Sequence, residues 1–205
     1  LQNDRKVILV TSTVSGEGKS FTSANLAISL SLLGKKVVIV GLDIRKPGLN
    51  KVFSLSSKEK GITQYLSNPE MDLMSLVQPS DVNKNLFILP GGTVPPNPTE
   101  LLEDGSLATL MQDLRDEYDY IFIDCPPIDI VADTQIIEQY ADRTLFVVRA
   151  GLLDRSLLPE LESIYQEKRF KNLSVILNGT ESTGGRYGYR YGYHNGYDSY
   201  YGNTK

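Results

Sequence analysis

The sequence has little cysteine, little net charge and no long apolar run. The single cysteine, Cys125, excludes any disulfide within the chain, and it fits a reduced setting in which it is a small buried hydrophobe. The longest apolar runs, such as VILV at 7–10, fall far short of the roughly 18 residues of a membrane span, and we expect no signal peptide. The formal net charge of -4 disfavours a general affinity for nucleic acid, although Arg186 and Arg190 make the end of the chain locally basic. We therefore expect a soluble chain that does not bind nucleic acid.

The segment 182–205 lacks Leu, Ile, Val, Met and Phe altogether. It contains six glycines and seven of the twelve tyrosines in the chain. Such a segment buries too little apolar surface to offset the entropy lost on ordering, so we expect a mobile tail. The remaining residues, 1–181, are enough for one α/β domain with a sizeable core. Because the chain begins at Leu1 and not at Met, we expect it to be a piece of a longer protein.

Short β-branched runs alternate with stretches of helical periodicity. This alternation predicts a mostly parallel, twisted sheet with helices on both faces and with ligands at the carboxyl ends of its strands. The sequence does not determine the strand order. Expected strands cover 6–10, 36–40, 86–89, 120–123, 144–148 and 173–177, and expected helices cover 23–33, 100–118, 133–140 and 156–168.

Residues that break or cap regular structure fall between these segments. Gly34 is expected to end the first helix, and Pro90 with Gly91 and Gly92 is expected to end a strand. Thr99, after the sequence PPNP, is expected to cap the helix that follows.

The run from Thr11 to Ala27, TSTVSGEGKSFTSANLA, follows the first expected strand and enters the first expected helix, as a phosphate-binding P-loop does. Backbone N–H groups and the helix N-terminus form a positive concavity for phosphate oxygens there. Gly16 and Gly18 permit a close backbone approach, Lys19 reaches the β and γ phosphates, and the Ser20 hydroxyl suits Mg²⁺. The alternative is a glycine-rich turn beside a surface lysine.

Two aspartates follow expected strands at the same edge of the sheet. Asp43 comes after VVIVGL and Asp124 after YIFI. Carboxylates beside a P-loop suit Mg²⁺, which takes one or two of them together with substrate phosphates. Each aspartate alone is more typical of a turn or a helix cap than of a metal site; the combination of both with GEGKS favours the metal.

Three further polar residues near these motifs have two interpretations each. Arg45 and Lys46 either stabilise charge on a transferring phosphoryl group or face solvent. Asn178, at the end of the last expected strand, either hydrogen-bonds adenine or forms an Asn-Gly turn.

Taken together, these motifs resemble the bacterial tyrosine kinases (BY-kinases) associated with capsule and exopolysaccharide export. The resemblance covers nearly the whole chain and rests on GEGKS at 16–20, DIRKP at 43–47, PPNPTELL at 95–102, FIDCPP at 122–127 and the terminal tyrosines. It implies a P-loop NTPase fold of the MinD/ParA type. It also implies an enzyme that binds ATP and Mg²⁺ and transfers phosphate to tyrosine.

The resemblance also implies roles for particular residues. Walker A contains Lys19 and Ser20, Walker A′ contains Asp43 and Arg45, and Walker B contains Asp124. The implied catalytic residues are Lys19, Asp43, Arg45 and Asp124; the metal ligands are Ser20, Asp43 and Asp124; the ATP-binding residues are Ser15, Gly16, Glu17, Gly18, Lys19, Ser20, Phe21 and Asn178; and the phosphorylated residues are Tyr187, Tyr189, Tyr191, Tyr193, Tyr197, Tyr200 and Tyr201.

The chain departs from the family pattern at several positions. Gly41 replaces the first aspartate of DxDxR, and Ser15 stands where these kinases commonly have proline. MinD and ParA carry a lysine at the position of Val14, so its absence disfavours a partitioning ATPase. The EX2RX2R helix that precedes the first strand in the family, and serves in ring assembly, is not within residues 1–5.

From the resemblance we expect an autokinase at the cytoplasmic face of the bacterial plasma membrane. Its expected partners are its own tail, presented in trans within a homo-oligomeric ring, a membrane-spanning activator that is fused or separate, and polysaccharide-biosynthesis proteins as substrates. The alternatives are a P-loop ATPase switch and an ATP-binding regulator without catalysis. For the tail alone, the alternating tyrosines from 187 to 193 also suit an edge strand or a segment that stacks on bases.

Overall fold

The computed structural model describes residues 6–56, 59–128 and 131–180. The expected domain boundary after residue 181, the tail 182–205 and all seven of its tyrosines lie outside the described residues. Within the described ranges, no helix has both the length and the apolar character needed to cross a membrane.

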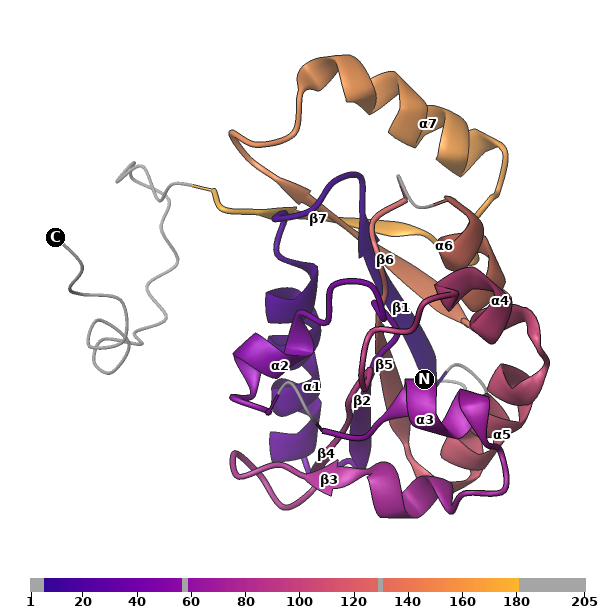
Figure 1. The fold of residues 1–205 in the computed structure, drawn as a ribbon. Coiled ribbons are helices and arrows are strands. Elements are labelled where there is room, and N and C mark those ends of the chain that lie inside the picture. Colours follow the sequence, from indigo (N-terminus) through magenta and orange to yellow (C-terminus); the bar gives the residue numbers. More distant parts are fainter. Residues whose placement is uncertain (1–5, 57–58, 129–130, 181–205) are drawn as a thin grey trace, which may run out of the picture.

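The sheet contains seven strands in the order β3-β4-β2-β5-β1-β6-β7 (Figure 1). Every neighbouring pair is parallel except β3 with β4. The expected mostly parallel α/β sheet is therefore confirmed. The strands are β1 (Val7–Ser12), β2 (Val37–Gly41), β3 (Gln78–Pro79), β4 (Leu86–Leu89), β5 (Tyr120–Asp124), β6 (Arg143–Arg149) and β7 (Ser174–Asn178).

Strands β1 and β2 are buried along their whole length, because helices cover both faces of the sheet centre. In the parallel register, Val10 of β1 and Gly41 of β2 both stand opposite Asp124 of β5. The carboxyl ends of the three central strands therefore meet at one edge, where the loops that follow them converge.

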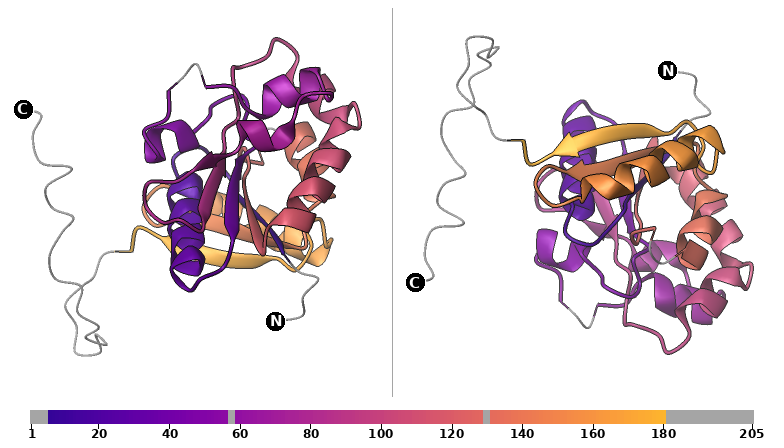
Figure 2. Two further views of the ribbon diagram at one scale, coloured as in Figure 1. Left: turned by 90° about the horizontal axis from the view of Figure 1, so that it is seen from below. Right: turned by 90° about the horizontal axis from the view of Figure 1, so that it is seen from above.

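Two layers of helices enclose the sheet (Figures 1 and 2). Helix α1 packs against β1, β2 and β5 on one face, and α5, α6 and α7 contribute buried side chains to the cluster on the other. The helices are α1 (Lys19–Leu32), α2 (Leu49–Val52), α3 (Ile62–Ser67), α4 (Pro98–Glu103), α5 (Ser106–Glu117), α6 (Val131–Glu138) and α7 (Leu158–Gln166), with short 3-10 turns η1 (Leu73–Leu76) and η2 (Arg155–Leu157).

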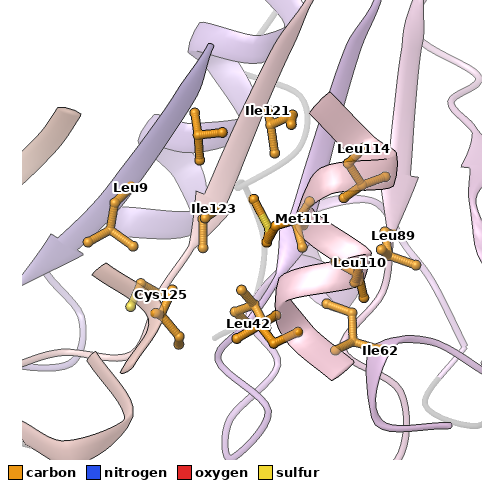
Figure 3. Packing of buried hydrophobic residues seen from close by; sticks show 14 of the residues in the cluster. Leu9, Leu42, Ile62, Leu89, Leu110, Met111, Leu114, Ile121, Ile123 and Cys125 are labelled. Atoms are coloured by element: carbon orange, nitrogen blue, oxygen red, sulfur yellow. The ribbon is translucent and has the colours of Figure 1, made fainter. Parts of the chain in front are cut away.

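The larger core lies between α5 and the sheet (Figure 3). Leu110, Met111 and Leu114 of α5 are each at most 1% exposed and belong to the same buried cluster as Ile121 and Ile123 of β5. Fixing β5 in this way also fixes Asp124, the last residue of that strand.

Several expected boundaries were wrong, each for a local reason. The single helix expected over 100–118 is two helices, α4 and α5, because Gly105 has a φ of 93° and cannot continue α4. Thr99 does not cap α4, because Asn97 is the N-cap residue. Thr99 belongs to the first turn of the helix, and its hydroxyl donates to Asp133. The first helix ends at Leu32, just before Gly34 as expected, but begins at Lys19, earlier than the periodicity indicated.

Candidate active site

The loop between β1 and α1 has the backbone of a phosphate-binding loop. Gly16 and Gly18 adopt φ angles of 91° and 100°, and Gly18 is the N-cap residue of α1. This left-handed backbone is accessible to glycine at little cost, and it turns successive N–H groups toward the helix N-terminus. Lys19 is the first residue of the helix and is only 7% exposed.

Glu17 stabilises the P-loop through hydrogen bonds that its buried carboxylate accepts from backbone N–H groups. Its side chain is fully buried, with Oε2 accepting from the Val14 N–H at 2.9 Å and Oε1 from the Arg149 N–H at 3.3 Å. Arg149 also donates from Nη1 to the Gly16 carbonyl at 3.0 Å. Glu17 was predicted to bind ATP; its carboxylate instead binds backbone N–H groups of the loop and of β6, and contact with ATP stays a prediction. No local motif indicated Arg149, which comes from the end of β6.

Asn178 links the last strand to the P-loop. Its Nδ2 donates to the Glu17 carbonyl at 2.9 Å, and its Oδ1 accepts from the Gly179 N–H at 2.8 Å, with Gly179 at a φ of 67°. This is the Asn-Gly turn that the sequence allowed, and contact with adenine stays a prediction. A Cβ on Gly18 would lie 2.2 Å from Asn178 Nδ2, so the close packing requires glycine there.

Ser20 and Asp124 form a pair at the start of α1. The Ser20 hydroxyl donates to Asp124 Oδ2 at 2.7 Å, and Asp124 is 1% exposed. Asp124 Oδ1 is buried and has no hydrogen-bond partner among the described residues. A buried carboxylate oxygen of this kind, beside a hydroxyl and a P-loop, suits Mg²⁺. Within the described ranges, no group of three or more acidic, histidine or cysteine side chains is placed to hold a metal ion.

The charge state of the site depends on burial. Burial raises the pKa of Asp124 to about 7, against the hydrogen bond from Ser20 and the charge of Lys19, while the nearby Asp43 raises it further. Burial also raises the pKa of Asp43, although the Lys46 N–H and Lys19 oppose this. Both carboxylates therefore hold protons more readily than exposed aspartates do, and bound cations would favour their charged forms.

Asp43 lies in the loop 42–48, which contacts Asp124 at its start and Ser20 at its end. The N–H groups of Leu42 and Asp43 both donate to the Asp124 carbonyl at 3.0 Å, and Asp43 Oδ1 accepts from the Lys46 N–H at 2.9 Å. At the other end of the loop, a Cβ on Gly48 would lie 2.4 Å from Ser20 Oγ. The structure thus brings together Lys19, Ser20, Asp43 and Asp124.

Arg45 points its guanidinium at a buried carboxylate of α6. Its Nε donates to Asp133 Oδ2 at 2.7 Å and its Nη2 to Asp133 Oδ1 at 3.1 Å and to Thr99 Oγ1 at 2.8 Å. No local motif indicated Asp133, which is 88 positions from Arg45. Of the other predicted residues, Ser15 and Phe21 are exposed, Phe21 by 62%.

Neighbouring positions explain two features of the sequence. Gly41 packs so closely that a Cβ there would lie 3.0 Å from the Gly91 nitrogen. Cys125 is fully buried, and burial raises the pKa of its thiol well above the usual value, so the thiol stays protonated. The expectation that Cys125 is a small buried hydrophobe is confirmed.

Comparison with known proteins agrees with this arrangement. Residues 5–158 match the AAA_31 family, described as an AAA domain. The tyrosine-protein kinase CpsD of Streptococcus agalactiae is 34% identical over 185 residues, which are 90% of this chain and 79% of that protein.

Solved structures give the same result. The kinase domain of the Escherichia coli tyrosine kinase ETK superposes with a TM-score of 0.80 at 27% identity, covering 94% of this chain and 74% of that one. The septum site-determining protein MinD of Pyrococcus horikoshii, in complex with Mg-ADP, shares the fold, with a TM-score of 0.66 at 22% identity over 84% of this chain and 69% of its own. The chain therefore belongs to the family of bacterial tyrosine kinases, which are ATP-dependent enzymes on a P-loop fold.

Proposed function

We propose that this kinase phosphorylates the tyrosines of its own C-terminal segment, Tyr187, Tyr189, Tyr191, Tyr193, Tyr197, Tyr200 and Tyr201. The observation that carries the proposal is the hydrogen bond from Asn178 to the P-loop. Asn178 is the last residue of β7, and the tyrosine segment begins a few residues later. The substrate groups are therefore attached to the chain at the border of the phosphate site.

We assign the phosphate-binding role to the P-loop and Lys19. Ser20, Asp124 and Asp43 would hold Mg²⁺, which supplies charge neutralisation on the phosphates. Asp124 Oδ1, buried without a hydrogen-bond partner in the described structure, fits such a ligand. Arg45 lies beside this set with its guanidinium bound to Asp133 and Thr99.

In the proposed reaction, a tyrosine oxygen forms a bond to the γ phosphorus as the bond from that phosphorus to the β–γ bridging oxygen breaks. The tyrosine proton passes to the Asp43 carboxylate, and ADP leaves. A free tyrosine hydroxyl has a pKa of about 10 and is mostly protonated at neutral pH. The loose character of phosphoryl transfer lowers the need for early deprotonation, so a carboxylate such as Asp43 can act as a late proton acceptor.

The first test is incubation of the chain with ATP and Mg²⁺, followed by mass spectrometry of the tail and measurement of ADP. Phosphotyrosine on the tail supports the proposal. ADP without phosphotyrosine would instead favour an ATPase switch, and nucleotide binding with neither product would favour a regulator without catalysis. A Lys19→Met chain, which lacks the phosphate-binding ammonium, is the control.

We also propose that transfer occurs in trans between subunits of a ring. A flexible chain of nineteen residues, the length from Tyr187 to the last residue, spans roughly 25 Å on average, a reach that would suit transfer within one chain or between neighbours. Mixing a Lys19→Met chain with an active chain lacking residues 182–205 tests this. The only tail then belongs to the inactive chain, and absence of label on it would rule out transfer in trans.

Phosphorylation is proposed to loosen this assembly. Seven phosphotyrosines would add roughly -10 to -14 charges at neutral pH, and tails so charged repel one another. In this proposal the kinase acts at the cytoplasmic face of the plasma membrane, with a membrane-spanning activator and a polysaccharide export system as partners and polysaccharide-biosynthesis proteins as further substrates. Light scattering of phosphorylated and dephosphorylated full-length protein tests the charge effect, and equal assembly of both forms would contradict it.

A further inference from the structure

We propose that Asp133 and Thr99 are positioning residues for phosphoryl transfer, which hold Arg45 and, through it, the loop that carries Asp43. The inference rests on the kinase reaction proposed above and assigns a task to two residues outside its P-loop and Walker motifs. It follows from one side-chain cluster that joins the loop 42–48, α4 and α6.

Hydrogen bonds link the three side chains Arg45, Asp133 and Thr99 pairwise. Arg45 donates two hydrogen bonds to the Asp133 carboxylate, from Nε at 2.7 Å and from Nη2 at 3.1 Å. Thr99 accepts from Arg45 Nη2 at 2.8 Å and donates to Asp133 Oδ1 at 2.7 Å. Two charge-assisted bonds in the planar fork geometry fix both the distance and the orientation of a guanidinium.

Burial shows which partner is the fixed one. Asp133 has a side chain that is 1% exposed, whereas the Arg45 side chain is 36% exposed. The carboxylate sits where α4 and α6 pack together, and Thr99 contacts it from α4. A buried carboxylate held by two helices thus presents a rigid anchor to an arginine on a loop.

The position of the anchored loop matters for the chemistry. Its first residues are attached to β5 through the two N–H bonds to the Asp124 carbonyl, and its last residue, Gly48, abuts Ser20. Arg45 is attached to Asp133 between these two points, only two residues after Asp43. Without it, the segment holding Asp43 would keep its end attachments and the burial of the Ile44 side chain in the core, and would lose the polar attachment in its middle.

The same geometry assigns a role to Arg45. Its Nε and Nη2 are committed to Asp133 and Thr99, so Arg45 acts by holding the loop, and the phosphate-binding charge is assigned to Lys19. A loop displaced by about 1 Å can lower a reaction rate by about 100-fold without abolishing substrate binding. We therefore expect a loss in kcat that exceeds the loss in ATP affinity.

A matched control is present at the opposite edge of the sheet. Asp142 forms a similar two-pronged pair with Arg115, with both bonds at 2.8 Å, and also accepts from the N–H of Val7 at the start of β1. Asp142→Asn removes an ion pair of the same type far from the phosphate loop. It separates a loss of stability from a loss of positioning.

The test measures tail phosphotyrosine, ADP release and binding of a fluorescent ATP analogue for the full chain and its Asp133→Asn, Thr99→Val and Asp142→Asn variants. We expect Asp133→Asn to lower kcat by about 100-fold with analogue binding nearly retained, Thr99→Val to lower it less, and Asp142→Asn to change stability alone. Thr99→Val keeps the charge pair and serves if Asp133→Asn does not fold.

Coupling provides a second readout. If Arg45 and Asp133 act as one unit, Arg45→Ala in the Asp133→Asn background lowers kcat no further. The inference is overturned if folded Asp133→Asn keeps the parent kcat, if it loses kcat and binding in equal measure, or if the two changes are additive. If the parent makes ADP but no phosphotyrosine, the proposed function fails while the positioning of the loop is still measured through ADP release.

Discussion

The contact between Gly18 and Asn178 predicts a specific cost for Gly18→Ala. Gly18 has a φ of 100°, and an added Cβ would lie 2.2 Å from Asn178 Nδ2. The methyl group would displace the amide, which would then lose its 2.9 Å bond to the Glu17 carbonyl. The substitution therefore combines backbone strain with the loss of one hydrogen bond.

Gly105 provides the matched control for the strain. It is also a helix N-cap residue, with a φ of 93°, but a Cβ there would meet nothing within 4 Å. Gly105→Ala should cost about 1–2 kcal/mol, the price of a left-handed backbone for alanine. Gly18→Ala should cost the same strain plus about 0.5–1.5 kcal/mol for the hydrogen bond.

Urea unfolding of the two single variants, of Asn178→Ala and of the double variant Gly18→Ala/Asn178→Ala measures these terms. Because the single changes at 18 and 178 each lose the same hydrogen bond, the double variant should be less destabilised than their sum by about 1 kcal/mol. Equal costs for Gly18→Ala and Gly105→Ala, together with full additivity at 18 and 178, would refute the proposed packing of Asn178 on the P-loop.

Three further predictions concern the charged site. In the nucleotide-free parent, Asp124 has a pKa of about 7 in the folded chain and about 4 in the unfolded chain. The free energy of unfolding of the parent should therefore fall by on the order of a few kcal/mol as pH rises from the lower to the higher value. Asp124→Asn removes this group and should flatten the pH dependence. Unfolding curves at several pH values check this, and an equal slope in both proteins would contradict it. Ser20→Ala, which removes the hydroxyl bound to Asp124, should weaken Mg²⁺-dependent nucleotide binding by at least about 10-fold, as measured by titration with and without a chelator; Ser29→Ala, on the exposed side of α1, is the control. Asp43→Asn should lower phosphotyrosine formation by about 10²–10⁴-fold, a larger loss than in Mg²⁺-dependent ATP binding, and normal autophosphorylation by this variant would exclude a base role.

The central strands could be predicted because their sequences need no tertiary information. Runs such as VVIV at 37–40 are apolar at every position, which is the pattern of a strand covered on both faces. Strand β3 could not be predicted, since Gln78 and Pro79 have no strand character and pair only because β4 offers an open edge. Strand order likewise depends on packing that no single segment encodes.

The residues of the candidate site were likewise predictable from the sequence only in part. Lys19, Ser20, Asp43 and Asp124 follow from contiguous motifs at strand ends, and the structure places them together. Asp133 could not be found in this manner, because its partners Thr99 and Arg45 lie 34 and 88 positions away. Gly105 did carry a local signal, but a glycine inside a helical pattern is compatible with either a break or a continuation.

Gly41 stands where the family's DxDxR motif has its first aspartate, and its packing means that a side chain there would affect several neighbouring positions. A Cβ at 41 would lie 3.0 Å from the Gly91 nitrogen, so the loop 90–92 would have to shift by a few tenths of an ångström; the same loop packs closely on Gly61, where a Cβ would lie 2.1 Å from the Pro90 carbonyl oxygen. Reintroducing aspartate by itself would therefore disturb the end of β4 and the start of α3 together. Gly41, Gly61 and Gly91 each leave room for the same stretch of backbone, so the missing carboxylate is a property of this three-way contact and not of position 41 alone.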